Sequence, residues 1–478
     1  MATWTFPITL EPRASGPVYL QIARAISADI RRGRLKPGDA LPGSRTLAAS
    51  LGVHRNTVLA AQRELEAEGW IRSLRHSMRV AEELPQSPTQ GRALLRGGLG
   101  FALEAPQAPL WPSRPERQGT LAFGGGVPDL RLVPTDWLAR AYGRALRSRP
   151  LMGYGDPKGE LRLRAGLAGM LSQVRGLAVG PDQLMVVGGS QMALDLVART
   201  LLRPGDRVAV EDPGYAPAWA TLRAAGAELV PVPVDGEGLR VDVLAERLRE
   251  HPIRALYCTP HHQYPTTVTM TAARRLRLLE LARTHRMAVL EDDYDFEFHF
   301  DGSPVLPLAS ADQAGVVVYM GTLSKVLAPG LRLGFLSGPQ TLIEALAARR
   351  HIADRQGDQV LERAVAELLE DGLLPRHVRK MRRVYQARRG VLAEALRQSL
   401  GDVIGFDLPP GGMSLWLRAD PALDVEAWAR RAEEKGVVFY PGHRYDFHGR
   451  ALPNLRLGFS TLNEVELQEA VRRMKAAL

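Results

Sequence analysis

Lys325 is the residue best placed for covalent chemistry, because it lies close to the end of an apolar strand. The strand is expected at Val316–Met320, and the run Gly321–Lys325 follows it directly. Burial lowers the pKa of a lysine amine, and the uncharged amine can form a Schiff base with an aldehyde. Arg332 follows seven residues later and could hold a phosphate group of the same ligand. Since Ser-Lys alone is a weak signal, its weight depends on the accompanying segments.

A second apolar strand, Ala288–Leu290, is followed by carboxylates and a tyrosine. It delivers Asp292 and Tyr294 to the C-terminal edge of a parallel sheet, where α/β folds bind ligands. A carboxylate there can keep a pyridine nitrogen protonated, which makes the ring an electron sink. The phenol can bond a phenolic oxygen of the same ring. A divalent metal is the alternative, but the spacing of a calcium loop is missing, so no metal is expected.

Three further segments accompany these two. Val186–Leu194 has the pattern of a strand, a glycine turn and a helix start, where backbone N–H groups can bind phosphate. Glu211–Tyr215 supplies an aromatic ring that could stack on a flat cofactor, and Arg456 is suited to a bidentate grip on a carboxylate. Each segment also has an ordinary structural explanation: the first can be any strand–helix junction, the second a packed tyrosine and the third a solvated arginine.

An α/β domain is needed to bring these segments together. From about Leu121 onward, short apolar runs alternate with longer amphipathic segments, which indicates a mostly parallel sheet with helices. A chain of 478 residues is too long for one ordinary core, and a stretch rich in Pro and Gly follows its first domain. We therefore expect a first domain at 13–82, a linker at 83–119 and the α/β domain at 120–478.

The first domain has the pattern of a helix-turn-helix. Helical periodicity covers Val18–Arg32, Arg45–Leu51 and Arg55–Glu68, with Ser44 as the expected cap of the second helix. The segments Trp70-Ile71-Arg72 and Met78-Arg79-Val80 are expected to pair as the two strands of a wing.

The charge of the chain is concentrated in this first domain. Residues 1–81 hold 12 Lys and Arg against 6 Asp and Glu, whereas the remaining 397 residues hold 50 against 46. A basic domain favours DNA as partner, although a solvated basic surface is the alternative. Arg55, Asn56 and Thr57 open the third helix and suit base edges in a major groove, while Arg75 on the wing would face phosphates or the minor groove.

Composition narrows the class of protein. The chain is 45% hydrophobic and 24% charged, which is typical of a soluble globular protein. No apolar run approaches the ~18 residues that cross a bilayer, and the N-terminus lacks a secretory pattern. The single cysteine, Cys258, excludes an intramolecular disulfide and a multi-cysteine metal site. We expect a cytoplasmic protein without a membrane partner.

The first domain resembles the winged helix-turn-helix of the GntR family. The matching segments are Gly33–Gly38, Leu41–Arg45, Leu51–Val53, Arg55–Val58 and Leu65–Trp70. The resemblance implies that Arg45, Arg55 and Thr57 contact DNA. Two positions depart from it. His54 replaces the usual Ser or Thr cap and is expected to weaken the cap, and the wing has Arg75–Met78 where glycines are common.

Residues 121–478 resemble the fold-type I, class I aminotransferases, and the whole chain resembles the MocR/GabR subgroup of GntR regulators. The implied fold class is multidomain, an α+β winged helix-turn-helix head plus an α/β PLP-dependent transferase fold-type I domain. The implied cofactor is pyridoxal 5'-phosphate (PLP), and the implied assembly is a homodimer in which Tyr154 reaches the neighbour's site. The implied roles are Lys325 for the Schiff base, Asp292 for the pyridine nitrogen, Tyr294 for the phenolic oxygen, Tyr215 for stacking, Ser190, Gln191, Thr322 and Arg332 for the phosphate, and Arg456 for an effector's carboxylate.

Two departures bear on function. Tyr264–Thr267 stands where catalytic aminotransferases often have Asn-Pro-Thr-Gly, and His261 replaces a residue that is often small in the subgroup. The sequence therefore predicts a PLP-dependent DNA-binding transcriptional regulator that senses PLP, an amino-acid-type effector or both. The alternatives are a catalytically active aminotransferase with an appended DNA-binding domain, and a DNA-binding protein whose second domain is structural. Intact Lys325, Asp292, Tyr294 and Arg332 argue against the last.

Overall fold

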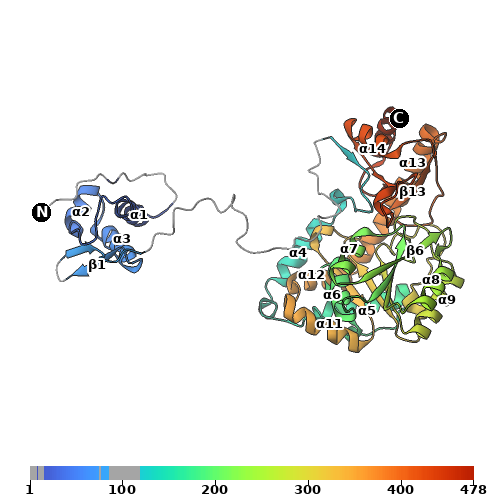
Figure 1. Cartoon of the computed structure of the whole chain (residues 1–478), viewed down its shortest axis with the longest axis horizontal. Helices are drawn as coiled ribbons and strands as arrows, with labels where there is room; N and C mark the ends of the chain where they lie inside the picture. Colours follow the sequence, from blue (N-terminus) through green and yellow to red (C-terminus); the bar gives the residue numbers. More distant parts are fainter. Residues whose placement is uncertain (1–7, 9–15, 75–76, 86–118) are drawn as a thin grey trace. The chain divides into compact units, whose positions relative to one another are not determined.

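The computed structural model describes residue 8 and residues 16–74, 77–85 and 119–478. The chain divides into two compact units, Met1–Ala105 and Pro106–Leu478. We call the first unit the head and the second the body (Figure 1). The predicted linker at 83–119 lies almost wholly outside the described residues.

The head is a three-helix domain with a β-hairpin, as the periodicity predicted. Its buried side chains come from all three helices and include Ile22, Ile26, Val58 and Leu65, which have no exposed surface. Figure 1 shows the helices gathered around the hairpin. The elements are α1 (Val18–Arg31), α2 (Ser44–Leu51), α3 (Arg55–Ala67), β1 (Ile71–Leu74) and β2 (Ser77–Val80).

The turn between α2 and α3 has the geometry of a helix-turn-helix. Gly52 ends α2 with a φ of 66°, a left-handed conformation that glycine adopts without steric cost. His54 then caps α3, because its Nδ1 accepts a hydrogen bond of 3.2 Å from the backbone N–H of Asn56. An imidazole nitrogen thus takes the place of the usual hydroxyl oxygen, and the expected weakening of the cap stays a prediction. Ser44 is the first residue of α2 rather than its cap.

The body is built on one eight-stranded sheet. Its strand order is β4-β11-β10-β9-β8-β5-β6-β7, in which β10, β9, β8, β5 and β6 run parallel to their neighbours in that series. The predicted mostly parallel sheet is thus confirmed, with β11 as an antiparallel insertion. The strands are β4 (Leu184–Val187), β5 (Arg207–Asp212), β6 (Glu228–Asp235), β7 (Gly238–Leu239), β8 (Ala255–Cys258), β9 (Ala288–Asp293), β10 (Val317–Thr322) and β11 (Gly334–Ser337).

Helices cover both faces of this sheet, so its strands are apolar on both sides, even at the edge strand β4. In β4, for example, Met185 and Val187 pack with α6, α7 and α11, while Leu184 and Val186 pack with α4, α5 and α12. Helices α8 and α9 cover the second face further along the sheet. The bounds are α4 (Thr135–Ala145), α5 (Leu161–Arg175), α6 (Ser190–Leu201), α7 (Ala216–Ala224), α8 (Val241–Glu250), α9 (Ala272–His285), α10 (Leu308–Ala311), α11 (Gln340–Ala353) and α12 (Gln359–Glu370).

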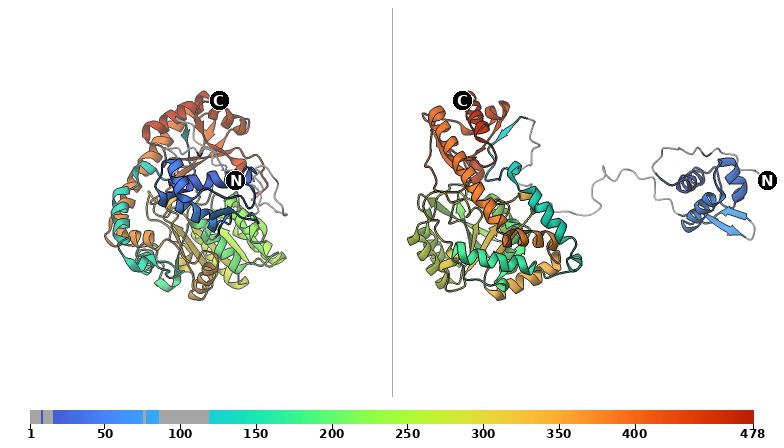
Figure 2. Two further views of the ribbon diagram at one scale, coloured as in Figure 1. Left: turned by 90° about the vertical axis from the view of Figure 1, so that its left-hand side faces the viewer. Right: turned by 180° about the vertical axis from the view of Figure 1, so that it is seen from behind.

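A smaller lobe completes the body. Its four-stranded sheet, in the order β12-β13-β16-β15, shares a core with the helices that follow the large sheet in the chain. Figure 2 shows this lobe in orange and red beside the large sheet. Its elements are α13 (Leu373–Leu400), β12 (Ile404–Gly405), β13 (Ser414–Ala419), α14 (Val425–Glu434), β14 (Val437–Val438), β15 (Tyr440–Pro441), β16 (Asn454–Gly458) and α15 (Glu464–Ala476), and β14 pairs with β3 (Leu121–Ala122).

Candidate functional site

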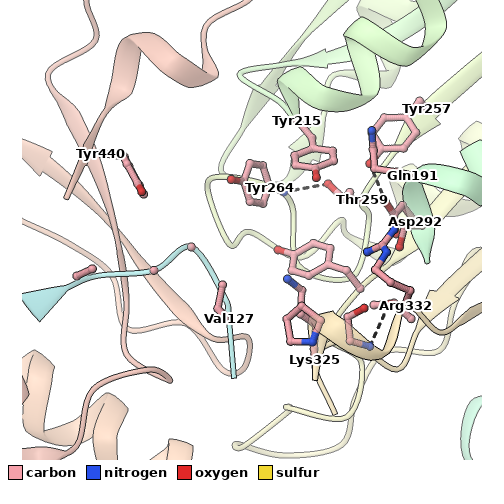
Figure 3. A pocket seen from close by; sticks show the side chains of 18 residues that line it. Val127, Gln191, Tyr215, Tyr257, Thr259, Tyr264, Asp292, Lys325, Arg332 and Tyr440 are labelled. Carbon is pink, nitrogen blue, oxygen red and sulfur yellow. Dashed lines mark hydrogen bonds between the residues drawn. The ribbon is translucent and has the colours of Figure 1, made fainter. Parts of the chain in front are cut away.

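A cavity of about 450 Å³ lies at the carboxyl ends of the parallel strands. Figure 3 shows Lys325, Asp292 and Tyr215 on one side of it, while Tyr440 and Val127 approach from the opposite side. Arg456 is adjacent, since a Cβ on the lining residue Gly125 would lie 3.1 Å from its guanidinium. The predicted cofactor residues that line the cavity are Ser190, Gln191, Tyr215, Asp292, Tyr294, Thr322, Lys325 and Arg332.

Lys325 lies three residues beyond β10 and is partly buried in the cavity wall. Burial and, to a lesser extent, the charge of Arg456 lower the pKa of its amine to about 8, against the opposing effect of Asp295 and Asp292. A lysine with a pKa near 8 has a useful uncharged fraction at neutral pH, which nucleophilic attack on an aldehyde requires.

Asp292, the last residue but one of the buried strand β9, has one carboxylate oxygen bonded and one without a partner among the described residues. Its Oδ2 accepts a hydrogen bond of 2.8 Å from the hydroxyl of Tyr257, and its buried Oδ1 has no partner among the described residues. Burial raises the pKa of Asp292 to about 6, against the hydrogen bond from Tyr257. A protonated ring nitrogen would give Oδ1 its missing donor and hold the carboxylate in its charged form.

The two tyrosines predicted to contact the cofactor ring line the cavity differently. The Tyr294 hydroxyl donates a hydrogen bond of 2.9 Å to the backbone oxygen of His262, so its proton points at the protein. Tyr215 meets the ring of Tyr264 edge to face, with centroids 5.0 Å apart.

The phosphate end combines a helix N-terminus with an arginine. Helix α6 begins at Ser190, directly after Gly189, whose φ is 97°. A Cβ on Gly189 would lie 3.0 Å from a guanidinium nitrogen of Arg332, so the missing side chain leaves room where the arginine and the helix N-terminus meet. The side chain of Gln191 faces α7 instead, because its amide donates to Thr221 Oγ1 at 3.1 Å. Thr322 Oγ1 accepts from the backbone of Ser324.

Arg456 is the most unusual group of the site. Its side chain, on β16, is 1% exposed, yet its three nitrogens donate no hydrogen bond within the described chain. The guanidinium carbon lies 4.4 Å from the centroid of the Tyr264 ring, so a cation–π contact is its main support. A buried charge without hydrogen bonds is costly, and a ligand carboxylate would supply the missing acceptors.

Sequence reasoning missed Tyr257, Thr259 and Tyr440 as cavity residues. Tyr257 lies in the fully buried strand β8, where an aromatic residue reads as core. A signal for it exists only in three dimensions, because β8 pairs with β9 and places the tyrosine beside Asp292. Tyr440 comes from the far lobe, and no local pattern connects it with Lys325.

The predicted DNA contacts gather at the start of α3 and α2. Arg45, Arg55 and Asn56 are exposed, and Thr57 is half-buried. The Nε of Arg55 donates to Ser44 Oγ at 3.2 Å, which holds the two helix starts together. Arg75 lies outside the described residues. Arg79 of the second wing strand donates a hydrogen bond of 2.7 Å to the backbone oxygen of Gly38, which holds its side chain against the fold.

Comparison with protein families agrees with both units. The gntR family of bacterial regulatory proteins matches residues 18–77, and the class I and II aminotransferase family matches residues 121–474. The fold also matches the α-aminoadipate aminotransferase of Thermus thermophilus, solved with N-(5'-phosphopyridoxyl)-L-leucine, at a TM-score of 0.70 and 33% identity over 76% of this chain and 92% of that one. Fold and site therefore define a DNA-binding regulator joined to a PLP-dependent domain of the aminotransferase fold.

Two regulators are similar over nearly the whole chain. The probable rhizopine catabolism regulatory protein MocR of Rhizobium meliloti is 34% identical over 98% of this chain and 95% of its own length. The transcriptional regulator TauR of Rhodobacter capsulatus is 33% identical over 98% of both chains. The chain belongs to the MocR/GabR subgroup of the GntR-family transcription regulators.

The residues of the cavity fit the cofactor of this fold, PLP. The free Oδ1 of Asp292, the amine of Lys325 and the cradle at Gly189 and Arg332 offer the three kinds of partner that its ring, aldehyde and phosphate need. When bound, PLP supplies an aldehyde that a lysine amine can attack and a ring that withdraws electrons. Across the part of the chain that the structure describes, no helix is both long and apolar enough to cross a membrane.

Proposed function

We propose that the body senses an amino acid at the PLP site and that the bound amino acid changes the affinity of the head for its DNA operator. The observation that carries this proposal is Arg456, a buried guanidinium without hydrogen bonds beside the cofactor cavity. A ligand with a carboxylate satisfies it, and an amine on the same ligand can reach the cofactor at Lys325. An amino acid has both groups.

The other cavity residues have proposed roles that run from the covalent link, through the ring, to the phosphate of PLP. Lys325 links PLP covalently, Asp292 bonds the ring nitrogen and Tyr215 stacks on the ring. Tyr294 bonds the phenolic oxygen once its hydroxyl turns away from the backbone oxygen of His262. Ser190, through the backbone at the start of α6, and Arg332 hold the phosphate, together with Thr322 and the backbone of Gln191. The solved phosphopyridoxyl-leucine complex of the similar aminotransferase supports an amino acid as ligand class.

The head contacts the operator through Arg45, Arg55, Asn56 and Thr57, with Arg75 on the wing. Exposed polar groups at the start of a recognition helix suit base edges and phosphates. A ligand in the body changes DNA affinity only if it binds two arrangements of the protein unequally. We place this regulation in the cytoplasm, on DNA of the nucleoid.

We also propose a homodimer in which Tyr154 reaches the neighbour's site. Tyr154 is 82% exposed although it is aromatic, and its ring lies over Arg355. Met152, two residues before Tyr154, and Ile352, in α11, are also exposed and add apolar surface. Sedimentation of the full chain tests this, since a monomer with PLP fully bound would contradict it.

The sensing proposal is tested with the PLP-loaded full chain. Operator DNA is first selected by the protein from random duplexes, and a panel of amino acids is then titrated against both the cofactor spectrum and DNA affinity. We expect one amino acid to shift both the cofactor spectrum and the DNA affinity. The Arg456→Gln variant should still bind PLP but show neither shift at the same concentrations. A spectral shift without any change in DNA affinity would contradict sensing.

The same samples separate sensing from catalysis. Sustained release of a 2-oxo acid in the presence of a second amino-group acceptor would establish the alternative, an active aminotransferase with an appended DNA-binding domain. A spectral change that stops after one equivalent, with DNA affinity altered, supports the regulator.

A further inference from the structure

Three histidines lie together in the body, away from the groups assigned to PLP. His261 and His262 belong to the loop that follows β8, and His299 follows β9 by six residues. All three are buried, with exposed fractions of 2%, 2% and 7%. One ring nitrogen from each lies within 4.8 Å of the others. The fold thus brings two distant segments together at a group of imidazoles.

The hydrogen bonds around these rings leave several nitrogens without partners. His262 Nδ1 lies 2.7 Å from Asp295 Oδ1, so the carboxylate holds the N–H on that side. Its Nε2 then carries a lone pair, and this buried atom has no hydrogen-bond partner among the described residues. The same is true of both ring nitrogens of His261, of His299 Nδ1 and of Asp295 Oδ2. Buried polar atoms without partners are rare, and five in one place call for a ligand.

Space beside His262 is kept open by a glycine. A Cβ on Gly411 would lie 2.5 Å from His262 Nε2 and 2.7 Å from the backbone oxygen of Phe298, so only glycine fits there. His299 and Gly411 form a β-bridge, which holds this glycine against the histidines. The site is therefore built from three segments rather than from one loop.

The chemistry of the group favours a cation. The ring nitrogens of His261 and the Nδ1 of His299, which lack partners among the described residues, can offer lone pairs to an ion. The nearest cationic side chains have partners of their own. Arg175 pairs with Glu297 and Tyr319, and Arg275 donates to the backbone oxygens of Met270, Leu306 and Pro260. Asp295 adds a negative charge directly behind His262.

We propose that His261, His262 and His299 bind one divalent first-row metal ion, with Zn²⁺ as the best fit. Three imidazoles with an open fourth position are a common zinc set, and Asp295 would orient His262 through its Nδ1–H as carboxylates do behind metal-bound histidines. Nitrogens that share a tetrahedral zinc ion at about 2.0–2.1 Å lie roughly 3.4 Å apart. The rings therefore close by about one ångström on binding, through rotation of their side chains.

The metal site adjoins the proposed PLP site without sharing a ligand with it. The backbone oxygen of His262 accepts the hydrogen bond of Tyr294, and Asp295 is the next residue in the chain after Tyr294. An ion on the three histidines would fix both segments that hold this tyrosine. Metal occupancy would thereby stiffen one wall of the cavity while leaving Lys325, Asp292 and Arg456 free.

The test uses the full-length, untagged chain, stripped of metal by a chelator and then titrated with Zn²⁺ against a chromogenic chelator. We expect one ion per chain, and we expect Co²⁺ to give the intense visible absorption of a four-coordinate site. A double variant, His261→Gln with His299→Gln, should lose this ion, while the exposed His285→Gln should keep it. Circular dichroism and the PLP absorbance of each variant report whether it is folded.

Binding of one ion by the wild-type chain that the folded double variant retains would overturn the assignment. So would the absence of any stoichiometric binding by the folded wild-type chain with either metal. If the double variant does not fold, the single variant His299→Gln serves instead, because it removes one of the three ligands and leaves the other two in place. Undiminished Zn²⁺ affinity in that variant would count against the site.

Discussion

The head and the body present their polar groups in opposite ways. In the head, three residues proposed to contact DNA are exposed, namely Arg45, Arg55 and Asn56, and of these described side chains only that of Arg55 has a hydrogen bond to the fold. In the body, Arg456 and Arg388 are buried, at 1% and 4% exposed, and Asp292 is buried with them. The side chains of the head that are proposed to contact DNA are therefore solvated, whereas these polar groups of the body are already shielded from water.

Backbone conformation shows the same contrast. Within the described residues, each head position with positive φ is a glycine, whereas the body places Thr267, Arg286, Arg332 and Arg355 there. A left-handed conformation costs a residue with a side chain roughly 1–2 kcal/mol. Two of these four, Thr267 and Arg332, lie at or beside the cofactor cavity. Strain of this kind persists where the surrounding structure fixes the geometry of a site. The backbone of the body is therefore pre-organised to a greater extent than that of the head.

The sharpest test of a pre-organised body is Lys325→Ala, for which we expect complete loss of the covalent link to PLP. Borohydride reduction followed by mass measurement should add the cofactor to the wild-type chain and nothing to the variant. The exposed Lys380→Ala removes an equal charge and should react like wild type. DNA affinity without effector should be unchanged in both, and cofactor mass on the Lys325 variant would refute the assignment.

A second test measures how much the free energy of unfolding falls when a buried charge of the body is removed. Arg388 donates to Asp129 Oδ2 at 3.0 Å and to the backbone oxygen of Ser460 at 2.7 Å. Asp129 keeps its ion pair with Arg131, so Arg388→Met should lower the free energy of unfolding by about 1.5–3 kcal/mol, the range for loss of a hydrogen bond to a charged group. Denaturant unfolding measures this.

The control for this variant lies on the same helix. Arg379 of α13 is exposed, and Arg379→Met should change the free energy of unfolding by less than about 0.5 kcal/mol. Equal effects of the two substitutions would show that burial does not distinguish the arginines of the body.

The head should respond differently, with lost affinity but intact stability. Arg55→Ala removes an exposed group from the start of the recognition helix, and we expect a loss of about 1–3 kcal/mol in DNA binding, roughly 5- to 150-fold. Titration at several salt concentrations identifies the kind of contact, because a lost phosphate contact also lowers the salt dependence. Arg24→Ala, an exposed arginine of α1, removes the same charge as a control. Equal losses of DNA affinity in the two variants would show that the effect comes from net charge and not from a contact of Arg55.

Much of this architecture could be predicted from the sequence, since its strands and helices depend on local patterns. The helix predicted at 18–32 differs from α1 by one residue, and the helix predicted at 55–68 differs from α3 by one residue. Both rest on periodicity, and the periodicity is strong because each element buries a continuous apolar face. The cavity residues that follow strands were also predictable, because the ends of parallel strands meet at one edge of a sheet.

The rest depended on contacts between distant segments. Nothing local shows that Tyr257 bonds Asp292, that Gln191 turns toward α7, or that His299 lies beside His261 and His262. That Arg456 has no hydrogen-bond acceptor among the described residues is likewise a property of its three-dimensional surroundings. His54 shows a different limit, since a preference for hydroxyl caps does not say what an imidazole does in the same place.

The smallest effect that we expect comes from Thr267, where the family pattern has glycine. Thr267 has a φ of 64°, and its backbone N–H donates to Gln263 at 2.7 Å, so the turn keeps its left-handed geometry despite a β-branched side chain. Thr267→Gly should raise the free energy of unfolding by up to about 1 kcal/mol, because relief of strain outweighs the greater freedom of glycine in the unfolded chain. Thr267→Ala keeps the Cβ and should bring little of this gain. If both variants are stabilised equally, the strain lies in the threonine side chain rather than the backbone, and the conformational contrast between head and body is weaker than these angles indicate.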